Sequence, residues 1–188
     1  MRIIAGSARG TKLETLPGEN TRPTSERAKE AVFSMLQFEL AGRRVLDLFA
    51  GSGQLALEAL SRGASAAVLC DASAAAAGVI SKNIEKTHMK ERCRLMRADY
   101  AVCVRMLGGE TFDLIFLDPP YAQRLVCPAL QALLAADAIA HGALIVCESE
   151  EADIFEKNPG LCEHFTVRKV AKYGAAHVTV LEYAAAEH

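Results

Sequence analysis

From residue 43 onward, short apolar runs alternate with stretches of helical periodicity, and this alternation limits the folds open to the chain more than any other feature. It predicts strands at residues 45–49, 66–70, 94–97, 112–117 and 143–148. Between them it predicts helices at residues 54–62, over an alanine-rich stretch ending near 87, at 100–107 and at 126–136. Repeated strand–helix–strand units pack as a mostly parallel sheet with helices on both faces, so we expect an α/β, Rossmann-like fold.

The two flanking regions follow a different pattern. Residues 1–22 are punctuated by glycine and proline and predict short strands and turns. Residues 24–40 place apolar side chains at helical spacing and predict an amphipathic helix. A short helix is expected near residues 152–157, and two antiparallel strands are expected at about 165–170 and 178–183.

Charge is unevenly distributed along the chain. The whole sequence has 188 residues and a net charge of −2, which excludes a uniformly basic nucleic-acid binder. Residues 1–44 nevertheless contain eight basic and five acidic residues, so this part is cationic while the remainder is acidic. Such a chain can present a cationic edge to a polyanion, although a solvated surface segment would have the same composition.

Three further classes of protein are disfavoured. The longest stretch without a charged residue, residues 125–136, is too short to cross a bilayer, so we expect no membrane contact. The first residues lack the apolar segment of a secretory signal, and we expect a cytoplasmic location. The six cysteines form no Cys-x-x-Cys pair and the five histidines are scattered, so we expect buried thiols and no metal site.

Glycines or polar residues follow four of the expected strands. Gly51 and Gly53 follow the first strand, Asp71 the second, Asp99 the third and residues 118–121 the fourth. Ligands of open parallel sheets bind beyond the carboxyl ends of the strands. The sequence therefore predicts one ligand site at this edge of the sheet.

The first of these features matches a loose nucleotide fingerprint, Gly-x-Gly-x-x-Ala, at residues 51–56. A carboxylate at Asp71 can accept both hydroxyl groups of a ribose, which fits nicotinamide enzymes and S-adenosylmethionine enzymes equally. Asp47 favours the second class, because it lies inside a strand that dinucleotide sites usually keep apolar. Structural roles stay open, with Asp47 as a hydrogen-bonded core carboxylate and Asp71 and Asp99 as helix caps.

The tetrapeptide Asp118-Pro119-Pro120-Tyr121 directly follows an apolar strand. An exocyclic amine of a nucleobase is a poor nucleophile because its lone pair is delocalised into the ring. Acceptors on both N–H groups, from Asp118 and the Pro119 carbonyl, would aim that lone pair at a methyl group, and the prolines keep the segment stiff. Tyr121 can stack on a base that is unpaired or extruded from folded RNA. A rigid turn with Tyr121 as core filler is the structural alternative.

Together these residues resemble a known family. Asp47-Leu-Phe-Ala-Gly51-Ser-Gly53 and Asp118-Pro-Pro-Tyr121 resemble the class I amino-methyltransferases. Segments similar to the RsmD family stand in the N-terminal stretch and before the last strand, at Arg2-Ile-Ile-Ala-Gly6, Arg9-Gly10, Arg22-Pro23-Thr24, Glu30-Ala31 and Lys172-Tyr173-Gly174. RsmD enzymes methylate N2 of one guanine in 16S ribosomal RNA, with S-adenosylmethionine as methyl donor.

The resemblance implies a seven-stranded methyltransferase domain over residues 43–188 and an RNA-binding extension over residues 1–42. The guanine would be held by Asp118, Pro119, Pro120 and Tyr121. S-adenosylmethionine would contact Asp47, Phe49, Ala50, Gly51, Ser52, Gly53, Asp71 at the ribose and Asp99 at the adenine. RNA contacts would come from Arg9, Lys12, Arg22 and Arg27. The implied partner is 16S rRNA, within a small ribosomal subunit or an assembly intermediate, bound by a monomer.

The chain departs from the family pattern after the second strand. Asp71 stands where relatives often have glutamate, and Ala72-Ser-Ala-Ala75 lacks their charged run. The Asp-Pro-Pro-Tyr motif alone does not choose the base, so DNA adenine N6 or another RNA amine is an alternative substrate. A non-catalytic ribosome-assembly factor is the alternative from another class, while Asp47 and the tetrapeptide count against a nicotinamide oxidoreductase.

Overall fold

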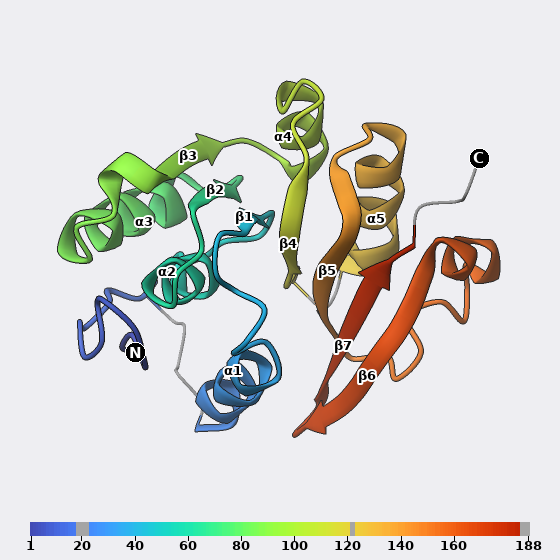
Figure 1. Ribbon diagram of the computed structural model, residues 1–188, viewed down its shortest axis with the longest axis horizontal. Coiled ribbons are helices and arrows are strands. Elements are labelled where there is room, and N and C mark those ends of the chain that lie inside the picture. The colour runs from blue at the N-terminus through green and yellow to red at the C-terminus, as the bar shows by residue number, and fades with distance from the viewer. Residues whose placement is uncertain (18–22, 121–122, 185–188) are drawn as a thin grey trace.

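A single mixed sheet forms the centre of the protein. The computed structural model describes residues 1–17, 23–120 and 123–184, and Figure 1 gives their arrangement. In these residues, seven strands form one sheet in the order β3-β2-β1-β4-β5-β7-β6. Strands β1 to β5 run parallel, and β7 is antiparallel to both β5 and β6. The expected α/β fold with a mostly parallel sheet is confirmed.

The elements have the following bounds. The strands are β1 (Arg44–Asp47), β2 (Ala66–Asp71), β3 (Cys93–Arg97), β4 (Phe112–Leu117), β5 (Ile139–Ser149), β6 (Phe165–Tyr173) and β7 (Ala176–Tyr183). The α-helices are α1 (Pro23–Met35), α2 (Gln54–Ser61), α3 (Ala74–Lys86), α4 (Tyr100–Met106) and α5 (Val126–Ala135). Short 3₁₀ helices are η1 (Lys90–Arg92) and η3 (Pro159–His164). Within the described ranges, none of these helices is both long and apolar enough to cross a membrane.

Helices cover both faces of the sheet and define two separate cores. Helices α1, α2 and α3 bury Val32, Leu57 and Ile80 in one cluster, and we call this side the α1–α3 face. Helices α4 and α5 bury Val104 and Leu130 in the other cluster, on the α4–α5 face. Apolar side chains of the helices pack against those of the strands in both clusters, so both faces of the sheet are shielded from water, as is usual for parallel sheets.

The strands divide their side chains between these faces by simple alternation. In β4, Leu114 and Phe116 join the cluster of the α1–α3 face, while Ile115 and Leu117 join the other. In β5, Leu144 and Val146 belong to the α1–α3 face. The alternation therefore fixes which face each residue at a strand end approaches.

Three expectations at the edges of elements were wrong. The first helix ends at Met35 and continues as turns, and residues 1–17 contain only an isolated bridge between Arg2 and Lys12 in place of short strands. Residues 152–157 form turns rather than a helix. There the Asp153 carboxylate accepts a hydrogen bond from the Phe155 amide at 2.9 Å, and the following residues continue as turns.

Candidate active site

The loop after β1 and the loop after β4 lie side by side at the carboxyl edge of the sheet. β1 pairs in parallel with β4, with Asp47 opposite Phe116, and the Leu48 amide extends the pairing by donating to the Phe116 carbonyl at 3.3 Å. The chain order between β1 and β4 reverses here, because β2 and β3 lie on one side and β5 on the other. This is the switch point at which open α/β sheets bind ligands.

The glycine loop after β1 has a backbone that only glycine accommodates well. Gly51 has φ +55° and Gly53 has φ +79°, both in the left-handed region. A Cβ on Gly53 would also lie 3.0 Å from a Leu69 methyl group, so the residue is constrained by space as well as by φ. The loop therefore turns tightly into α2, and its backbone lies at the carboxyl end of β1, where a ligand could approach it closely.

Side chains and backbone groups of neighbouring elements hold this loop in place. The Gly51 amide donates to Asp71 Oδ2 at 2.9 Å, and the Ala50 amide donates to the Cys70 carbonyl at 2.9 Å. The Ser52 carbonyl accepts a hydrogen bond from Asn83 Nδ2 at 2.9 Å. Asp71 Oδ1 accepts from the Ser73 amide at 2.8 Å, so Asp71 braces the loop and the start of α3 together.

Asp47 is a buried carboxylate without hydrogen-bond partners among the described residues. Its side chain is 1% exposed, and neither Oδ1 nor Oδ2 meets the geometry of a hydrogen bond. Burial raises the pKa of Asp47 to about 7, while the nearby Ala56 and Phe49 amides oppose that shift and the Asp71 charge adds to it. Both Asp47 oxygens thus lack a hydrogen bond of good geometry among the described residues, and a bound donor group could supply one.

Asp99 caps a helix, as its structural alternative predicted. Its Oδ1 accepts from the Ala101 amide at 2.9 Å at the start of α4, and the side chain is exposed. Next to it, the Tyr100 ring lies 5.6 Å from the Phe49 ring, measured between centroids. Ala50 and Ser52 are buried, so the loop offers its backbone rather than these side chains.

The loop after β4 begins with Asp118 and two prolines. Asp118 is partly buried, Pro119 is buried and Pro120 is exposed, whereas Tyr121 lies outside the described residues. Asp118 lines a cleft of about 110 Å³ together with Lys29, Gln54 and Glu148. Lys29 comes from α1 and Gln54 from the start of α2, so the N-terminal helix and the glycine loop both border the cleft.

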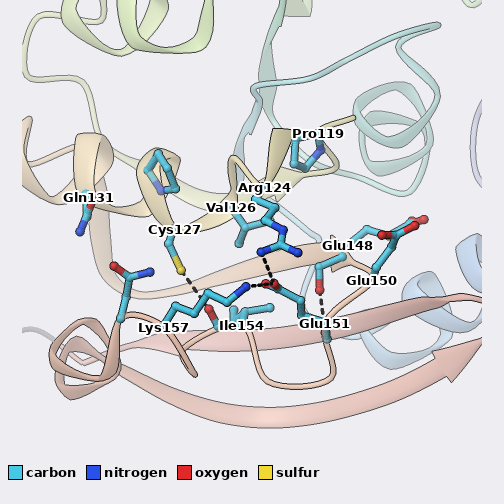
Figure 2. Close-up of a pocket in the computed structure, with 13 residues that line it drawn as sticks. Pro119, Arg124, Val126, Cys127, Gln131, Glu148, Glu150, Glu151, Ile154 and Lys157 are labelled. Atoms are coloured by element: carbon cyan, nitrogen blue, oxygen red, sulfur yellow. Dashed lines mark hydrogen bonds and ion pairs between the residues drawn. The ribbon is translucent and has the colours of Figure 1, made fainter. Parts of the chain in front are cut away.

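Pro119 lines a second, larger cavity of about 300 Å³ (Figure 2). The first residues of α5 and the segment after β5 form its walls. At its rim, Glu151 pairs with Arg124 at 3.7 Å and with Lys157 at 3.2 Å. Glu148 lines this cavity as well as the Asp118 cleft, and the sequence reasoning did not single it out.

The proposed RNA-contacting residues are only partly described. Arg9, Lys12 and Arg27 are exposed, while Arg22 lies outside the described residues. In the described part of the chain, no group of three or more His, Cys, Asp or Glu side chains could hold a metal ion.

A family model described as "Conserved hypothetical protein 95" matches residues 1–182, nearly the whole chain. The chain belongs to the RsmD family. Two members are named Ribosomal RNA small subunit methyltransferase D. The protein from Haemophilus influenzae is 34% identical over 153 residues, covering 80% of this chain and 79% of its own. The protein from Escherichia coli K12 is 35% identical over 150 residues, covering 80% and 75%.

Solved structures agree with this RsmD assignment. The chain superposes on yhhF from Escherichia coli with a TM-score of 0.84 and 30% identity, covering 98% of both chains. HI0767 from Haemophilus influenzae gives a TM-score of 0.79 and 28% identity over 98% of both chains. The sheet is thus that of the class I methyltransferases, as expected.

Two buried residues that anchor the N-terminal extension to helices α2 and α3 were not predicted from the sequence. Glu58 of α2 is fully buried and accepts hydrogen bonds from the Ile4 and Ala5 amides at 2.8 and 3.0 Å. Asn83 of α3 is fully buried and bonds the Glu14 amide and carbonyl at 2.7 and 2.9 Å. A signal existed at Glu58, because a charged residue there interrupts the apolar face of the expected helix.

Proposed function

We propose that this protein transfers the methyl group of S-adenosylmethionine to the exocyclic N2 amine of a guanine in 16S ribosomal RNA. The observation that carries the proposal is the adjacency of two strand-end loops, because β1 and β4 pair directly and end in the glycine loop and in Asp118-Pro119-Pro120. Membership of the RsmD family and relatives named as small-subunit rRNA methyltransferases support it.

The residues at the β1 edge fit a cofactor that carries an ammonium group. The unsatisfied Asp47 carboxylate would accept hydrogen bonds from such a group, which would also favour the charged form of Asp47. Gly51 and Gly53 let a ligand approach the backbone closely. We assign the ribose to Asp71, the adenine edge to Asp99, and the remaining contacts to Phe49, Ala50 and Ser52.

S-adenosylmethionine, when bound, supplies an electrophilic methyl group. The protein's own part is to hold the base. Asp118 and the Pro119 carbonyl accept hydrogen bonds from the two N–H groups of the amine, so that its lone pair leaves the ring plane. The two prolines fix the direction of both acceptors, and Tyr121 is assigned to stacking on the base. The extra proton leaves after methyl transfer, and no strong base is required.

The N-terminal extension, residues 1–42, is assigned to RNA binding. Exposed Arg9, Lys12 and Arg27 support this assignment, and Arg22 is included from its sequence alone. Residues 43–188 then form the methyltransferase domain. A small ribosomal subunit or an assembly intermediate is the proposed substrate particle, bound by a monomer.

The test is a methylation assay with labelled S-adenosylmethionine on unmodified small ribosomal subunits, naked 16S rRNA and plasmid DNA. We expect N2-methylguanosine in the ribosomal samples, identified by mass spectrometry of the nucleosides. Asp118→Ala should keep cofactor affinity and lower methyl transfer by on the order of 10² or more. Methyladenine in DNA would replace the proposal with the alternative substrate, and bound cofactor without any transfer would favour an assembly factor.

A further inference from the structure

Three carboxylates stand on one face of the sheet at the ends of three neighbouring strands. Alternation along β4 and β5 places Asp118 and Glu148 on the α1–α3 face, in line with Phe116 and Val146 of that cluster. Asp47 lies on the same face, in line with Val45. Asp47 is buried beside the glycine loop. Asp118 and Glu148 are therefore the two carboxylates beside the proposed base.

Asp118 and Glu148 are direct neighbours. Leu117 of β4 is in register with Cys147 of β5, so the next residue of each strand occupies matching positions on adjacent parallel strands. Such strands are about 4.8 Å apart. Both side chains are partly buried and line the same cleft, which independently supports the placement given by the register.

Glu148 also separates this cleft from the larger cavity. It lines the cleft together with Asp118 and the cavity together with Pro119 (Figure 2). Asp118 lines the cleft and Pro119 lines the cavity, so the start of this motif borders both hollows. A base held by Asp118 and the Pro119 carbonyl would therefore have Glu148 on a wall of its pocket, whichever hollow receives its ring.

Two adjacent acceptors select among the nucleobases. A pairing edge with two neighbouring donor groups, N1–H and the N2 amine, belongs to guanine alone among the four standard bases. Adenine has an N6 amine next to N1, which is an acceptor, and cytosine has an N4 amine next to the acceptor N3. A carboxylate opposite either ring nitrogen would place two lone pairs against each other and leave a buried acceptor unpaired.

We propose that Glu148 is the residue that selects guanine, by accepting a hydrogen bond from its N1–H while Asp118 holds the N2 amine. This inference rests on the proposed function and adds to it the reason why one base is chosen. Glu148 contacts the base and takes no part in moving the methyl group or the amine proton. Asp118 and Glu148 together would thus determine which base is methylated, a choice that the Asp-Pro-Pro-Tyr motif alone does not make.

The test compares two RNAs that differ only at the methylated position. One carries guanine there and the other carries 2-aminopurine, which keeps the N2 amine but has an acceptor at N1. Both RNAs compete in the same tube, so the ratio of the two products does not depend on the folded fraction of a variant. We expect the wild-type protein to favour guanine by at least about 10²-fold in kcat/KM, because a polar site rejects an analogue that leaves its groups unpaired.

The variant Glu148→Gln separates recognition from structure. A glutamine amide can accept from N1–H of guanine through its oxygen or donate to N1 of 2-aminopurine through its NH2 group, so we expect this variant to gain activity on 2-aminopurine and to bring the product ratio close to one. Glu163→Gln removes the same charge at an exposed position that lines neither hollow and should keep the wild-type ratio. Equal loss on both RNAs in Glu148→Gln, or a wild-type protein that does not discriminate, would overturn the role of Glu148. A wild-type protein that methylates no guanine would instead overturn the proposed function and the inference with it.

Discussion

The two faces of the sheet are built differently, although both are closely covered by helices. Among the described residues, the α1–α3 side buries seven polar or charged side chains, Lys29, Asp47, Ser52, Glu58, Ser61, Asn83 and Thr87. The α4–α5 face buries one, Thr179, which lies on the same side of β7 as Leu181 of that core. One side is therefore specified by individual hydrogen bonds, and the other by apolar packing.

The polar side is also where the N-terminal extension meets the glycine loop. Asn83 holds both Glu14 and the Ser52 carbonyl, and Ser61 accepts from the Ala8 amide at 3.0 Å and donates to the Ala5 carbonyl at 2.6 Å. Buried bonds of this kind cost little while complete and much when one partner is lost. The α4–α5 face, by contrast, should tolerate changes that conserve volume.

The largest effect is expected for Glu58→Ala. This change removes a fully buried carboxylate that lies 3.5 Å from Lys29 Nζ and 2.7 Å from Arg62 Nε and that accepts hydrogen bonds from the Ile4 and Ala5 amides. We expect the free energy of unfolding to fall by about 3–5 kcal/mol, measured by urea denaturation. Glu110→Ala is the control, because Glu110 also pairs with two cations, Arg44 at 2.7 Å and Arg94 at 2.8 Å, but at the surface. Its loss should stay below about 1 kcal/mol, and equal losses in the two variants would contradict the comparison.

A smaller effect is expected for Gly6→Ala. Its Cβ would lie 1.8 Å from the Ser61 carbonyl oxygen, at φ +85°. We expect a loss of about 2–4 kcal/mol, with faster hydrogen exchange of the Ile3 and Ile4 amides as the extension leaves α2. Gly10→Ala has nearly the same φ, +86°, with nothing within 4 Å of the new methyl group. It should cost about 1 kcal/mol and leave the exchange of these amides unchanged.

Asp47→Asn tests the buried carboxylate through pH. The pKa of Asp47 is raised from its ordinary value of 3.8 to about 7, so its stabilising contribution is complete below pH 3.8 and is lost as pH rises through 7. The asparagine variant does not suffer this loss. We expect its free energy of unfolding, relative to the wild type, to be higher at pH 8 than at pH 5 by about 2–3 kcal/mol in protein without ligand. A difference that does not change with pH would mean that Asp47 is not protonated on folding.

The smallest effect is expected on the other face. Ile145 is fully buried in β5 among the apolar residues of the α4–α5 core. Ile145→Val should cost about 0.5–1.5 kcal/mol, because one methylene is lost without stranding a polar group. Urea denaturation measures it. A cost as large as that of Glu58→Ala would remove the distinction between the two faces.

The sequence predicts the sheet because its signals are local. β2, β4 and α5 lie within one or two residues of their expected bounds, since apolar runs and glycine or proline stops act over a few residues. The strand-end positions of Asp71, Asp99 and Asp118 follow from the same pattern. Contacts between distant residues account for the differences. β5 begins at Ile139 rather than at the expected residue 143, because Ile139 pairs with Phe112 of β4.

The anchors of the extension depend on contacts that sequence spacing does not reveal. Glu58 meets Ile4 across 54 positions of the chain, and Asn83 meets Glu14 across 69. The charge of Glu58 within an apolar helix face hints at a buried partner, but no short window of the sequence shows which residues Glu58 and Asn83 contact. The expected helix at residues 152–157 forms turns, because a pattern of six residues offers too few helical bonds to offset the cost of starting a helix.

The position of β7 also affects how the chain folds as it is synthesised. β7 is the last strand in chain order but lies between β5 and β6 in the sheet. Until residues 176–183 have left the ribosome, β5 has an open edge that carries Leu144, Ile145 and Val146, and β6 has no strand to pair with. An open apolar edge is prone to pair with other chains, so the nascent protein is most exposed to aggregation just before its last strand emerges.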